Sequence, residues 1–249
     1  MHTLLFPDLR SDGALILIEG DEAHHAIRVK RVREGERVRV MNGRGVVAEC
    51  EVVRAKRDLE LRPARVRTIE PVRPAVHVWS ATPKGPRVDE LVDALVQTGA
   101  ASWTPMSTRL GVVDPRETKI QRLHRIALEA AKQAQRAWLM EVREKSTFEE
   151  AIAPEPGQWL LLADARGSPI TELEIPTPRD SIRLLIGPEG GWTDEEREAA
   201  RRAGARACRL GPYTMRIETA APVGVGVILA MFSAAGCNPP ASDPQESEP

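Results

Sequence analysis

The stretch Leu184-Leu185-Ile186-Gly187-Pro188-Glu189-Gly190-Gly191-Trp192-Thr193-Asp194 decides the fold of the larger part of this 249-residue chain. Its first three residues form a short apolar run, typical of a parallel strand buried on both faces, and Gly187 with Pro188 ends that run. Thr193 and Glu196 have the spacing of a capping box, so we expect a helix to begin near Asp194. A strand, a glycine loop and a helix start in this order form a ligand-binding loop in open α/β sheets.

The chemistry of this loop favours a cationic or zwitterionic ligand. Gly190 and Gly191 permit positive φ and let another molecule approach the backbone closely. The two common phosphate fingerprints, G-x-G-x-x-G and G-x-x-x-x-G-K-[ST], are absent from the loop. Glu189 would also repel a phosphate placed beside it. For this segment alone, the alternative is an ordinary Gly/Pro connection that binds nothing.

Length and composition are those of a globular protein with room for one large or two ordinary domains. The chain is 42% hydrophobic and 29% charged. No apolar run approaches membrane-spanning length, and Met1 to Arg10 lacks the pattern of a secretory signal, so we expect a cytoplasmic protein without membrane contact. Cys50, Cys208 and Cys237 lie far apart. This spacing argues against a disulfide framework or a zinc site, and we expect no metal.

The N-terminal part is basic and reads as a small β domain. From His24 to Arg67 there are thirteen Lys and Arg against six Asp and Glu, a pattern typical of a nucleic-acid-binding surface, although a solvated face is the common alternative. The turn Asn42 to Gly45 is a strong hairpin signal. We expect a β-barrel over residues 1–72, with strands at Ala14–Ile18, Arg37–Met41, Val46–Val53 and Leu59–Arg67.

After the proline-rich segment Glu70–Pro74 the pattern changes to alternating strands and helices. Residues 73–236 are therefore expected to form an α/β domain with a parallel sheet, and residues 237–249 a disordered tail. Gly224 and Gly226 in the last helix predict close packing against another backbone or a second subunit. The expected elements are strands Val76–Ser80, Trp103–Met106, Trp159–Ala163, Ile182–Ile186 and Ala207–Leu210, and helices Val88–Thr98, Arg116–Ala137, Asp194–Ala203 and Glu218–Phe232.

A second loop, Leu210-Gly-Pro-Tyr-Thr-Met-Arg-Ile-Glu-Thr-Ala220, also lies between a strand and a helix. It should leave the same carboxyl edge of the sheet as the glycine loop, and two such loops define a pocket. Arg216 and Glu218 bring opposite charges to it, and Thr219 lies in the first helical turn, where backbone amides are free. A structural salt bridge with a helix cap is the alternative.

These residues resemble the bacterial ribosomal RNA small subunit methyltransferase E family. The two C-terminal motifs are highly specific for it, whereas the N-terminal matches are weaker. The chain departs from the family at Gln97–Gly99, Q-T-G in place of E-L-G, and at Met215–Ala220, M-R-I-E-T-A in place of L-R-T-E-T-A. The matching motifs are G-P-E-G-G at Gly187–Gly191, L-G at Leu210–Gly211, M-R-I-E-T-A at Met215–Ala220, D-E-A-H-H at Asp21–His25 with Arg28 to Arg33, P-K-G at Pro83–Gly85, Arg109, and E-A-A-K-Q at Glu129–Gln133 with Arg136.

The resemblance implies an N-terminal PUA-like β-barrel and a C-terminal SPOUT α/β domain with a deep trefoil knot. It implies a homodimer that uses S-adenosylmethionine to methylate N3 of a uridine in 16S rRNA. Main-chain groups of three loops would hold the cofactor: Leu162, Ala163, Asp164, Ile186, Gly187, Pro188, Glu189, Gly190, Gly191, Leu210, Gly211, Met215, Arg216 and Thr219. The residues expected to hold the RNA are His25, Arg28, Arg31, Lys84, Arg109 and Arg136.

The expected chemistry needs help with a proton, because N3 of uracil is protonated and weakly nucleophilic near neutral pH. Arg216 is expected to stabilise negative charge on the uracil. Glu218, Glu129 or solvent could accept the proton, and Glu218 could instead orient Arg216. The sequence leaves open which uridine is modified and whether free rRNA or the assembled small subunit is the substrate. The alternatives are action on another RNA nucleotide, a non-catalytic RNA-binding assembly protein, or a Rossmann-type nucleotide enzyme.

Overall fold

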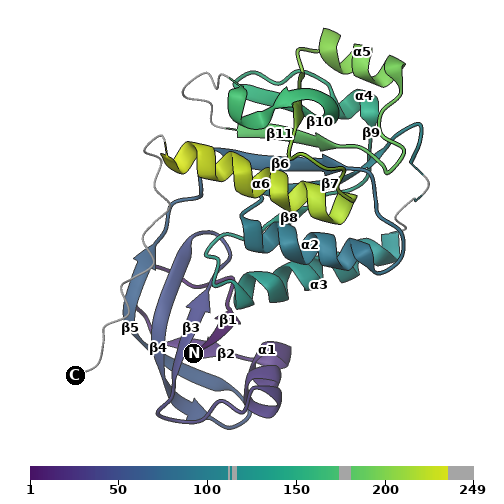
Figure 1. Ribbon diagram of the computed structural model, residues 1–249. Helices are drawn as coiled ribbons and strands as arrows, with labels where there is room; N and C mark the ends of the chain where they lie inside the picture. Colours follow the sequence, from purple (N-terminus) through teal and green to yellow (C-terminus); the bar gives the residue numbers. More distant parts are fainter. Residues whose placement is uncertain (112, 114–116, 174–180, 235–249) are drawn as a thin grey trace. The chain divides into compact units, whose positions relative to one another are not determined.

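The computed structural model describes residues 1–111, 113, 117–173 and 181–234, which fall into two compact units (Figure 1). The first unit contains Met1–Pro71 together with Ala131–Leu139, and the second contains the residues from Val72 to Ala130 and from Met140 onward. The first unit therefore takes in a segment from the middle of the chain that residues 1–72 do not contain. The tail expected at residues 237–249 lies outside the described residues.

The first unit is a five-stranded sheet that curls around its own apolar core (Figure 1). The strand order is β1-β3-β4-β5-β2, with β1 parallel to β3 and the other pairs antiparallel. Leu4, Val38, Val40, Leu59 and Leu61 are completely buried in it. The strands are β1 (His2–Leu5), β2 (Ile16–Ile18), β3 (Arg37–Met41), β4 (Val46–Ala55) and β5 (Leu59–Thr68).

The expected hairpin between β3 and β4 is confirmed. Oδ1 of Asn42 accepts hydrogen bonds from the backbone amides of Arg44 (2.8 Å) and Val46 (3.0 Å), which closes the turn. A helical segment that the sequence did not predict follows β2, with α1 at Gly20–His24 and a wide turn, η1, at His25–Val29. The amide of Lys30 donates to the carbonyl of His25 (3.0 Å), a five-residue spacing.

The segment Ala131–Leu139 completes the first unit. Lys132 Nζ lies 2.9 Å from Oε2 of Glu22, and the lysine side chain is only 4% exposed. Oε1 of Glu22 accepts a hydrogen bond from the amide of Leu5 (2.9 Å), so this carboxylate is held on both sides. Trp138 Nε1 donates to the carbonyl of Ile69 (2.7 Å). The segment thus contributes a buried ion pair and an aromatic ring that the β-strands alone lack.

The second unit is built on a seven-stranded sheet whose strand pairs are all parallel, as the alternating pattern predicted. Its main path is β12-β10-β11-β6-β7-β8, and β9 pairs with β7. The strands are β6 (Ala75–Ser80), β7 (Ser102–Ser107), β8 (Glu141–Val142), β9 (Ser146–Thr147), β10 (Gln158–Pro169), β11 (Ser181–Ile186) and β12 (Arg206–Arg209).

Helices cover both faces of this sheet (Figure 1). Helices α2 and α6 pack against each other, and α6 also contacts β6 and β11. On the other face, Phe148 and Trp192 pack near α4 and α5 with ring centroids 5.4 Å apart. No helix in the described part of the chain is long and apolar enough to cross a membrane. The helices are α2 (Arg87–Thr98), α3 (Glu117–Gln133), α4 (Phe148–Ala151), η2 (Ile170–Glu172), α5 (Asp194–Arg202) and α6 (Ile217–Ala234).

Several element boundaries differ from the expected ones. The long helix expected to reach Ala137 ends at Gln133, because Gln135 adopts a left-handed φ of 55° and stops it. Its expected first residue, Arg116, lies outside the described residues. The strand expected at Ala14–Ile18 is only Ile16–Ile18, and the strand expected to end at Ala163 continues to Pro169. Strands β1, β8 and β9 and helix α4 were not predicted.

The two glycines of α6 have different surroundings. A Cβ on Gly224 would lie 2.6 Å from Cδ2 of Leu184 and 3.2 Å from Cδ1 of Leu210, so this position needs glycine to bring α6 against β11. A Cβ on Gly226 would meet no described atom within 4 Å. The close packing expected for the pair is therefore found at Gly224, against side chains of the same chain.

Candidate functional site

The predicted loops leave one edge of the sheet. Parallel register places Ala163 of β10 beside Ile186 of β11, and Ile186 beside Ser80 of β6. On the other side of β10, Ala163 pairs with Cys208 of β12. The glycine loop, the second loop and the P-K-G segment therefore all begin at the carboxyl ends of neighbouring strands. This edge is the position at which open parallel sheets bind ligands.

Trp192 fixes the shape of the glycine loop. Its Nε1 donates to the carbonyl of Ala163 (2.9 Å), which ties the loop to the end of β10. A Cβ on Gly187 would lie 2.9 Å from Cε2 of the same ring, so glycine is required there for the ring to reach its partner. Gly191 has a φ of 72°, and its amide donates a hydrogen bond to the carbonyl of Pro188 (2.8 Å), which closes a turn. Gly190, by contrast, is outside the left-handed region.

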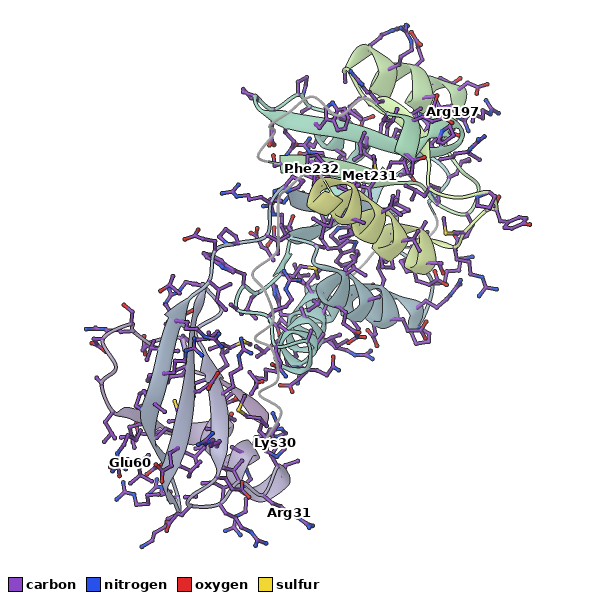
Figure 2. All side chains as sticks on the ribbon, turned by 60° about the vertical axis from the view of Figure 1, so that its left-hand side comes forward. Lys30, Arg31, Glu60, Arg197, Met231 and Phe232 are labelled. Atoms are coloured by element: carbon purple, nitrogen blue, oxygen red, sulfur yellow. The ribbon has the colours of Figure 1, made fainter. Side chains whose placement is uncertain are left out.

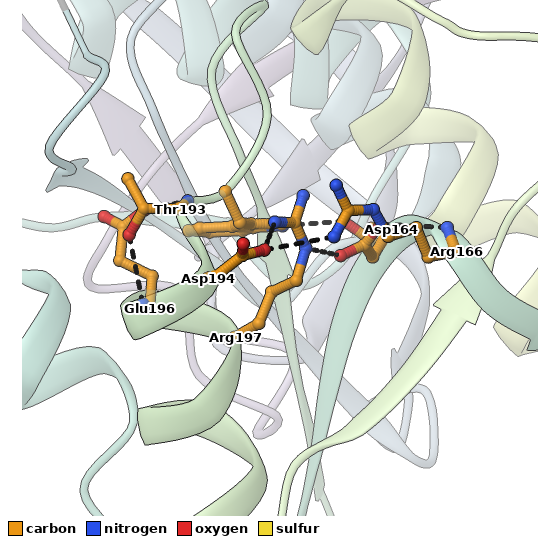
Figure 3. Close-up of polar contacts among 8 residues, drawn as sticks. Asp164, Arg166, Thr193, Asp194, Glu196 and Arg197 are labelled. Carbon is orange, nitrogen blue, oxygen red and sulfur yellow. Dashed lines mark hydrogen bonds and ion pairs between the residues drawn. The ribbon is translucent and has the colours of Figure 1, made fainter.

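Helix α5 begins with the predicted capping box (Figure 3). The amide of Thr193 donates to Oε2 of Glu196 (2.9 Å), and the amide of Glu196 donates to the Thr193 hydroxyl (3.2 Å). Glu196 is 4% exposed, and its Oε1 accepts a hydrogen bond from the amide of Arg109 (2.9 Å). One carboxylate therefore caps α5 and anchors the loop after β7 to the start of that helix.

Asp164, a predicted cofactor residue, uses its side chain within the protein (Figure 3). Its Oδ2 accepts a hydrogen bond from Nε of Arg197 (2.5 Å), and its Oδ1 accepts from the amide of Arg166 (2.9 Å). Asp194 joins the two arginines, at 2.9 Å from Arg197 and 3.1 Å from Arg166. The hydrogen bond to Asp164 raises the pKa of Arg197 above its usual value. Because the Asp164 side chain is engaged within the protein, the segment Leu162–Asp164 can offer a ligand mainly its main-chain groups.

The second loop ends at Arg216, whose side chain is exposed. The carbonyl of Arg216 accepts hydrogen bonds from the amides of Thr219 (3.0 Å) and Ala220 (2.7 Å). The expectation that the Thr219 amide is free was wrong, because a three-residue bond tightens the first turn of α6 and uses this donor. Leu210 packs near the Gly224 position, and Met215 lies beside Gly211. Tyr213 in the same loop is 84% exposed.

Arg87, at the start of α2, is a site residue that the sequence did not indicate. Its Nη1 lies 3.3 Å from Oε1 of Glu218 and 3.8 Å from Oε1 of Glu189. The expected partner of Glu218 was Arg216, but within the described part of the chain Arg216 forms no ion pair. The only signal in the sequence for Arg87 was its position two residues after the P-K-G segment. Its pairing with Glu218 could not be predicted, because the two residues are 131 positions apart in the sequence.

The predicted RNA-binding residues fall in both units. Lys84 and Arg109 of the second unit are exposed, as are Arg28 and Arg31 of the first. Arg31 lies beside Lys30 at the end of the α1–η1 segment (Figure 2). His25 and Arg136 are half-buried, and burial lowers the pKa of Arg136 to about 10, so this guanidinium remains charged near neutral pH. Among the described residues no cluster of His, Cys, Asp or Glu could hold a metal ion.

Comparison with known proteins gives two domain matches and a relative that matches most of the chain. Residues 70–229 match the RNA methyltransferase domain, and residues 18–63 match the RNA methyltransferase PUA domain. The ribosomal RNA small subunit methyltransferase E of Mycobacterium bovis is 30% identical over 92% of this chain and 92% of its own length. The chain belongs to this methyltransferase E family.

Solved structures of related methyltransferases have the same fold as this chain. The methyltransferase E of Neisseria gonorrhoeae, bound to S-adenosylmethionine, is 22% identical, covers 93% of this chain and 98% of its own, and superposes with a TM-score of 0.84. A methyltransferase of Legionella pneumophila with bound S-adenosylmethionine is 26% identical, covers 92% and 97%, and has a TM-score of 0.79. The predicted family, with its curled N-terminal sheet and C-terminal parallel α/β sheet, is confirmed.

Proposed function

We propose that this protein transfers a methyl group from S-adenosylmethionine to N3 of a uridine in 16S rRNA of the small ribosomal subunit. The observation that carries the proposal is the position of two motif loops, Ile186–Gly191 and Leu210–Arg216, at the carboxyl ends of β11 and β12, the two parallel strands that flank β10. These are the two most specific family motifs, and they lie in a chain that matches the RNA methyltransferase domain over residues 70–229.

The groups at this edge fit S-adenosylmethionine. Glu189 is half-exposed and suits a cationic or zwitterionic ligand, while the packing of Trp192 on Gly187 fixes the shape of the loop backbone. When bound, the cofactor supplies a methyl group on a positively charged sulfur, which keeps the electron pair of the broken C–S bond. The proposed binding residues are Leu162, Ala163, Asp164, Ile186, Gly187, Pro188, Glu189, Gly190, Gly191, Leu210, Gly211, Met215, Arg216 and Thr219.

Arg216 is proposed to act on the uracil. Its guanidinium is exposed at the end of the second loop, where it can approach a uracil carbonyl oxygen and stabilise the negative charge that develops as N3 loses its proton. The uridine must be unstacked to enter the site, since N3 is hidden in a duplex. His25, Arg28, Arg31, Lys84, Arg109 and Arg136 would hold the RNA backbone by charge.

The resemblance further supports a deep trefoil knot in the second unit and a homodimer formed through it. Helix α6 offers support for the dimer, since Gly226 leaves room on its surface for another backbone. Equilibrium sedimentation of the purified protein tests this part of the proposal. A monomer at micromolar concentration would contradict it.

The methylation itself is tested by incubating the protein with labelled S-adenosylmethionine and either unmodified small subunits or free 16S rRNA. Mass spectrometry of the digested RNA then identifies the modified nucleoside. We expect 3-methyluridine at one position. Label on a ribose or on another base would overturn the N3-uridine assignment. Failure to bind S-adenosylmethionine in calorimetry would favour a non-catalytic RNA-binding role.

A further inference from the structure

Arg87 forms ion pairs with a carboxylate of the glycine loop, Glu189, and with one in the first turn of α6, Glu218. It lies at the first position of α2, directly after the P-K-G segment, and its side chain is 29% exposed. From there its guanidinium lies 3.3 Å from Glu218, at the start of α6, and 3.8 Å from Glu189, in the glycine loop. The planar guanidinium presents several donors in a fixed geometry, so it can hold two carboxylates at once.

The two carboxylates are not equivalent. Glu189 is 50% exposed, and its separation from Arg87 exceeds hydrogen-bonding distance. Glu218 is only 10% exposed, and its Oε1 accepts a hydrogen bond from Arg87 Nη1. An ion pair as exposed as the first contributes little, whereas a buried and hydrogen-bonded carboxylate is fixed in place. Arg87 therefore acts mainly on Glu218.

The second oxygen of Glu218 has no partner. Oε2 is buried, and no described donor reaches it. A buried acceptor without a donor costs about 1–3 kcal/mol, and more when it belongs to a charged group. Such an atom in a binding site calls for a donor supplied by a ligand. The last torsion of a glutamate is broad, so a turn of the carboxylate alone can present this oxygen.

We propose that Arg87 is a positioning residue that holds Glu218 so that its unpartnered oxygen accepts the N3 proton of the target uracil. This inference rests on the proposed methylation. The N3–H electron pair forms the new bond to the methyl carbon, the C–S bond breaks with its electron pair left on sulfur, and the proton passes to Glu218 and then to solvent. Glu218 is the second residue of α6 and follows Arg216 by two residues, so both groups lie within one turn of the chain.

The test compares Arg87→Gln, Arg87→Lys, Glu218→Gln and the double variant Arg87→Gln/Glu218→Gln in the full-length protein. The matched control is Arg122→Gln. Arg122 lies in α3 and pairs with Asp89, which is on α2 like Arg87, so this change removes an ion pair to α2 without altering Glu189 or Glu218. For each protein we would measure kcat and KM on unmodified small subunits, the Kd for S-adenosylmethionine by calorimetry, and the melting temperature.

A positioning role predicts a specific pattern. Glu218→Gln should lower kcat by about 10²–10⁴-fold, the range of a lost general base. Arg87→Gln should lower kcat by about 10–100-fold with KM and the cofactor Kd little changed, and it should also lower the melting temperature because the buried Glu218 carboxylate loses its cation. Arg87→Lys should recover part of both losses. Because Arg87 acts through Glu218, the double variant should be no slower than Glu218→Gln alone. Arg122→Gln should resemble the unaltered protein.

Other outcomes overturn the inference. Additive losses in the double variant, or a loss in Arg87→Gln that appears only in KM or in the cofactor Kd, would mean that Arg87 does not act through Glu218. Unchanged kcat in Arg87→Gln would have the same meaning while leaving the methylation intact. Absence of transfer by the unaltered protein would overturn the proposed function together with the inference, so the two failures are distinguishable.

Discussion

At the residue scale, Arg216 has separate tasks for its main chain and its side chain. The carbonyl closes the first turn of α6 through hydrogen bonds from Thr219 and Ala220. The side chain is exposed and forms no ion pair within the described part of the chain. The fold therefore depends on the backbone at this position, and the guanidinium remains available for a ligand.

Replacing Arg216 by Ala should slow methyl transfer by orders of magnitude with little loss of stability. The loss of one charge-stabilising donor from an active site typically lowers the rate by about 10²–10³-fold. The hydrogen bonds that start α6 involve the backbone carbonyl, which the substitution keeps. Labelled-methyl transfer and thermal unfolding measure the two effects, and Arg216→Lys serves as the charge-retaining control. Unchanged turnover in Arg216→Ala would show that its catalytic role is wrong.

The two described cysteines offer a second prediction at this scale. Burial raises the pKa of Cys50 and of Cys208 to about 12. At pH 8 only ~10⁻⁴ of each thiol is then the reactive thiolate. In a Cys237→Ser background, Ellman's reagent at pH 8 should therefore label neither thiol in the folded protein and both thiols in denaturant. One rapid equivalent of reaction without denaturant would contradict the buried positions.

The candidate site was predictable from sequence where its signals are local. The glycine loop and the start of α5 are encoded by neighbouring residues, Gly187, Thr193 and Glu196, whose contacts the structure confirms. Arg87 could not be found in this way, because its contact with Glu218 joins residues 131 positions apart. The Asp164–Arg197 pair was hidden for the same reason. Local chemistry predicts loops, whereas side-chain pairing across a sheet edge depends on the tertiary fold.

At the element scale, helix α6 shows how one glycine can be required and its neighbour dispensable. Gly224 brings the helix against Leu184 of β11, where an added Cβ would lie 2.6 Å from a methyl group. Gly226, two residues later, points to space that no described atom fills within 4 Å. Within one subunit, a side chain added at Gly224 would therefore lower stability, whereas one added at Gly226 would not.

This difference predicts opposite effects of the same substitution. Gly224→Ala should lower the free energy of unfolding by about 1–3 kcal/mol, as expected for overpacking. At a protein concentration at which the proposed dimer is dissociated, Gly226→Ala should leave it unchanged or raise it by up to about 1 kcal/mol, because alanine is the better helix former. Urea unfolding followed by circular dichroism measures both. Equal destabilisation by the two variants would refute the packing described for α6.

Among the elements, regular periodicity predicted the long strands and helices well. Strand β3 and helix α2 agree with the expected bounds to within one residue. The α1–η1 segment and the two-residue strands β8 and β9 are too short for any periodic signal. The end of α3 was missed because the alanine-rich pattern continues past Gln133, while the left-handed conformation of Gln135 stops the helix.

At the scale of the whole molecule, neither compact unit is formed by one continuous segment of the chain. Ala131–Leu139 belongs with Met1–Pro71, so the first unit is completed only after more than half of the chain has passed. A boundary read from a proline-rich segment assumes continuous domains, and composition carries no sign of such a return. The family motif E-A-A-K-Q at Glu129–Gln133 supplies Lys132, which explains in physical terms why this segment matters for the N-terminal sheet.

The Lys132–Glu22 pair should therefore govern the stability of the first unit. Lys132→Met leaves the partly exposed Glu22 carboxylate without its lysine partner and should cost about 1–3 kcal/mol of unfolding free energy. Glu22→Gln/Lys132→Met removes both charges and should recover most of that loss. Lys56→Met, at an exposed lysine of the same unit, should change stability by no more than about 0.5 kcal/mol. Urea unfolding followed by tryptophan fluorescence compares the four proteins, and a Lys132→Met variant as stable as Lys56→Met would rule out a buried ion pair at this position.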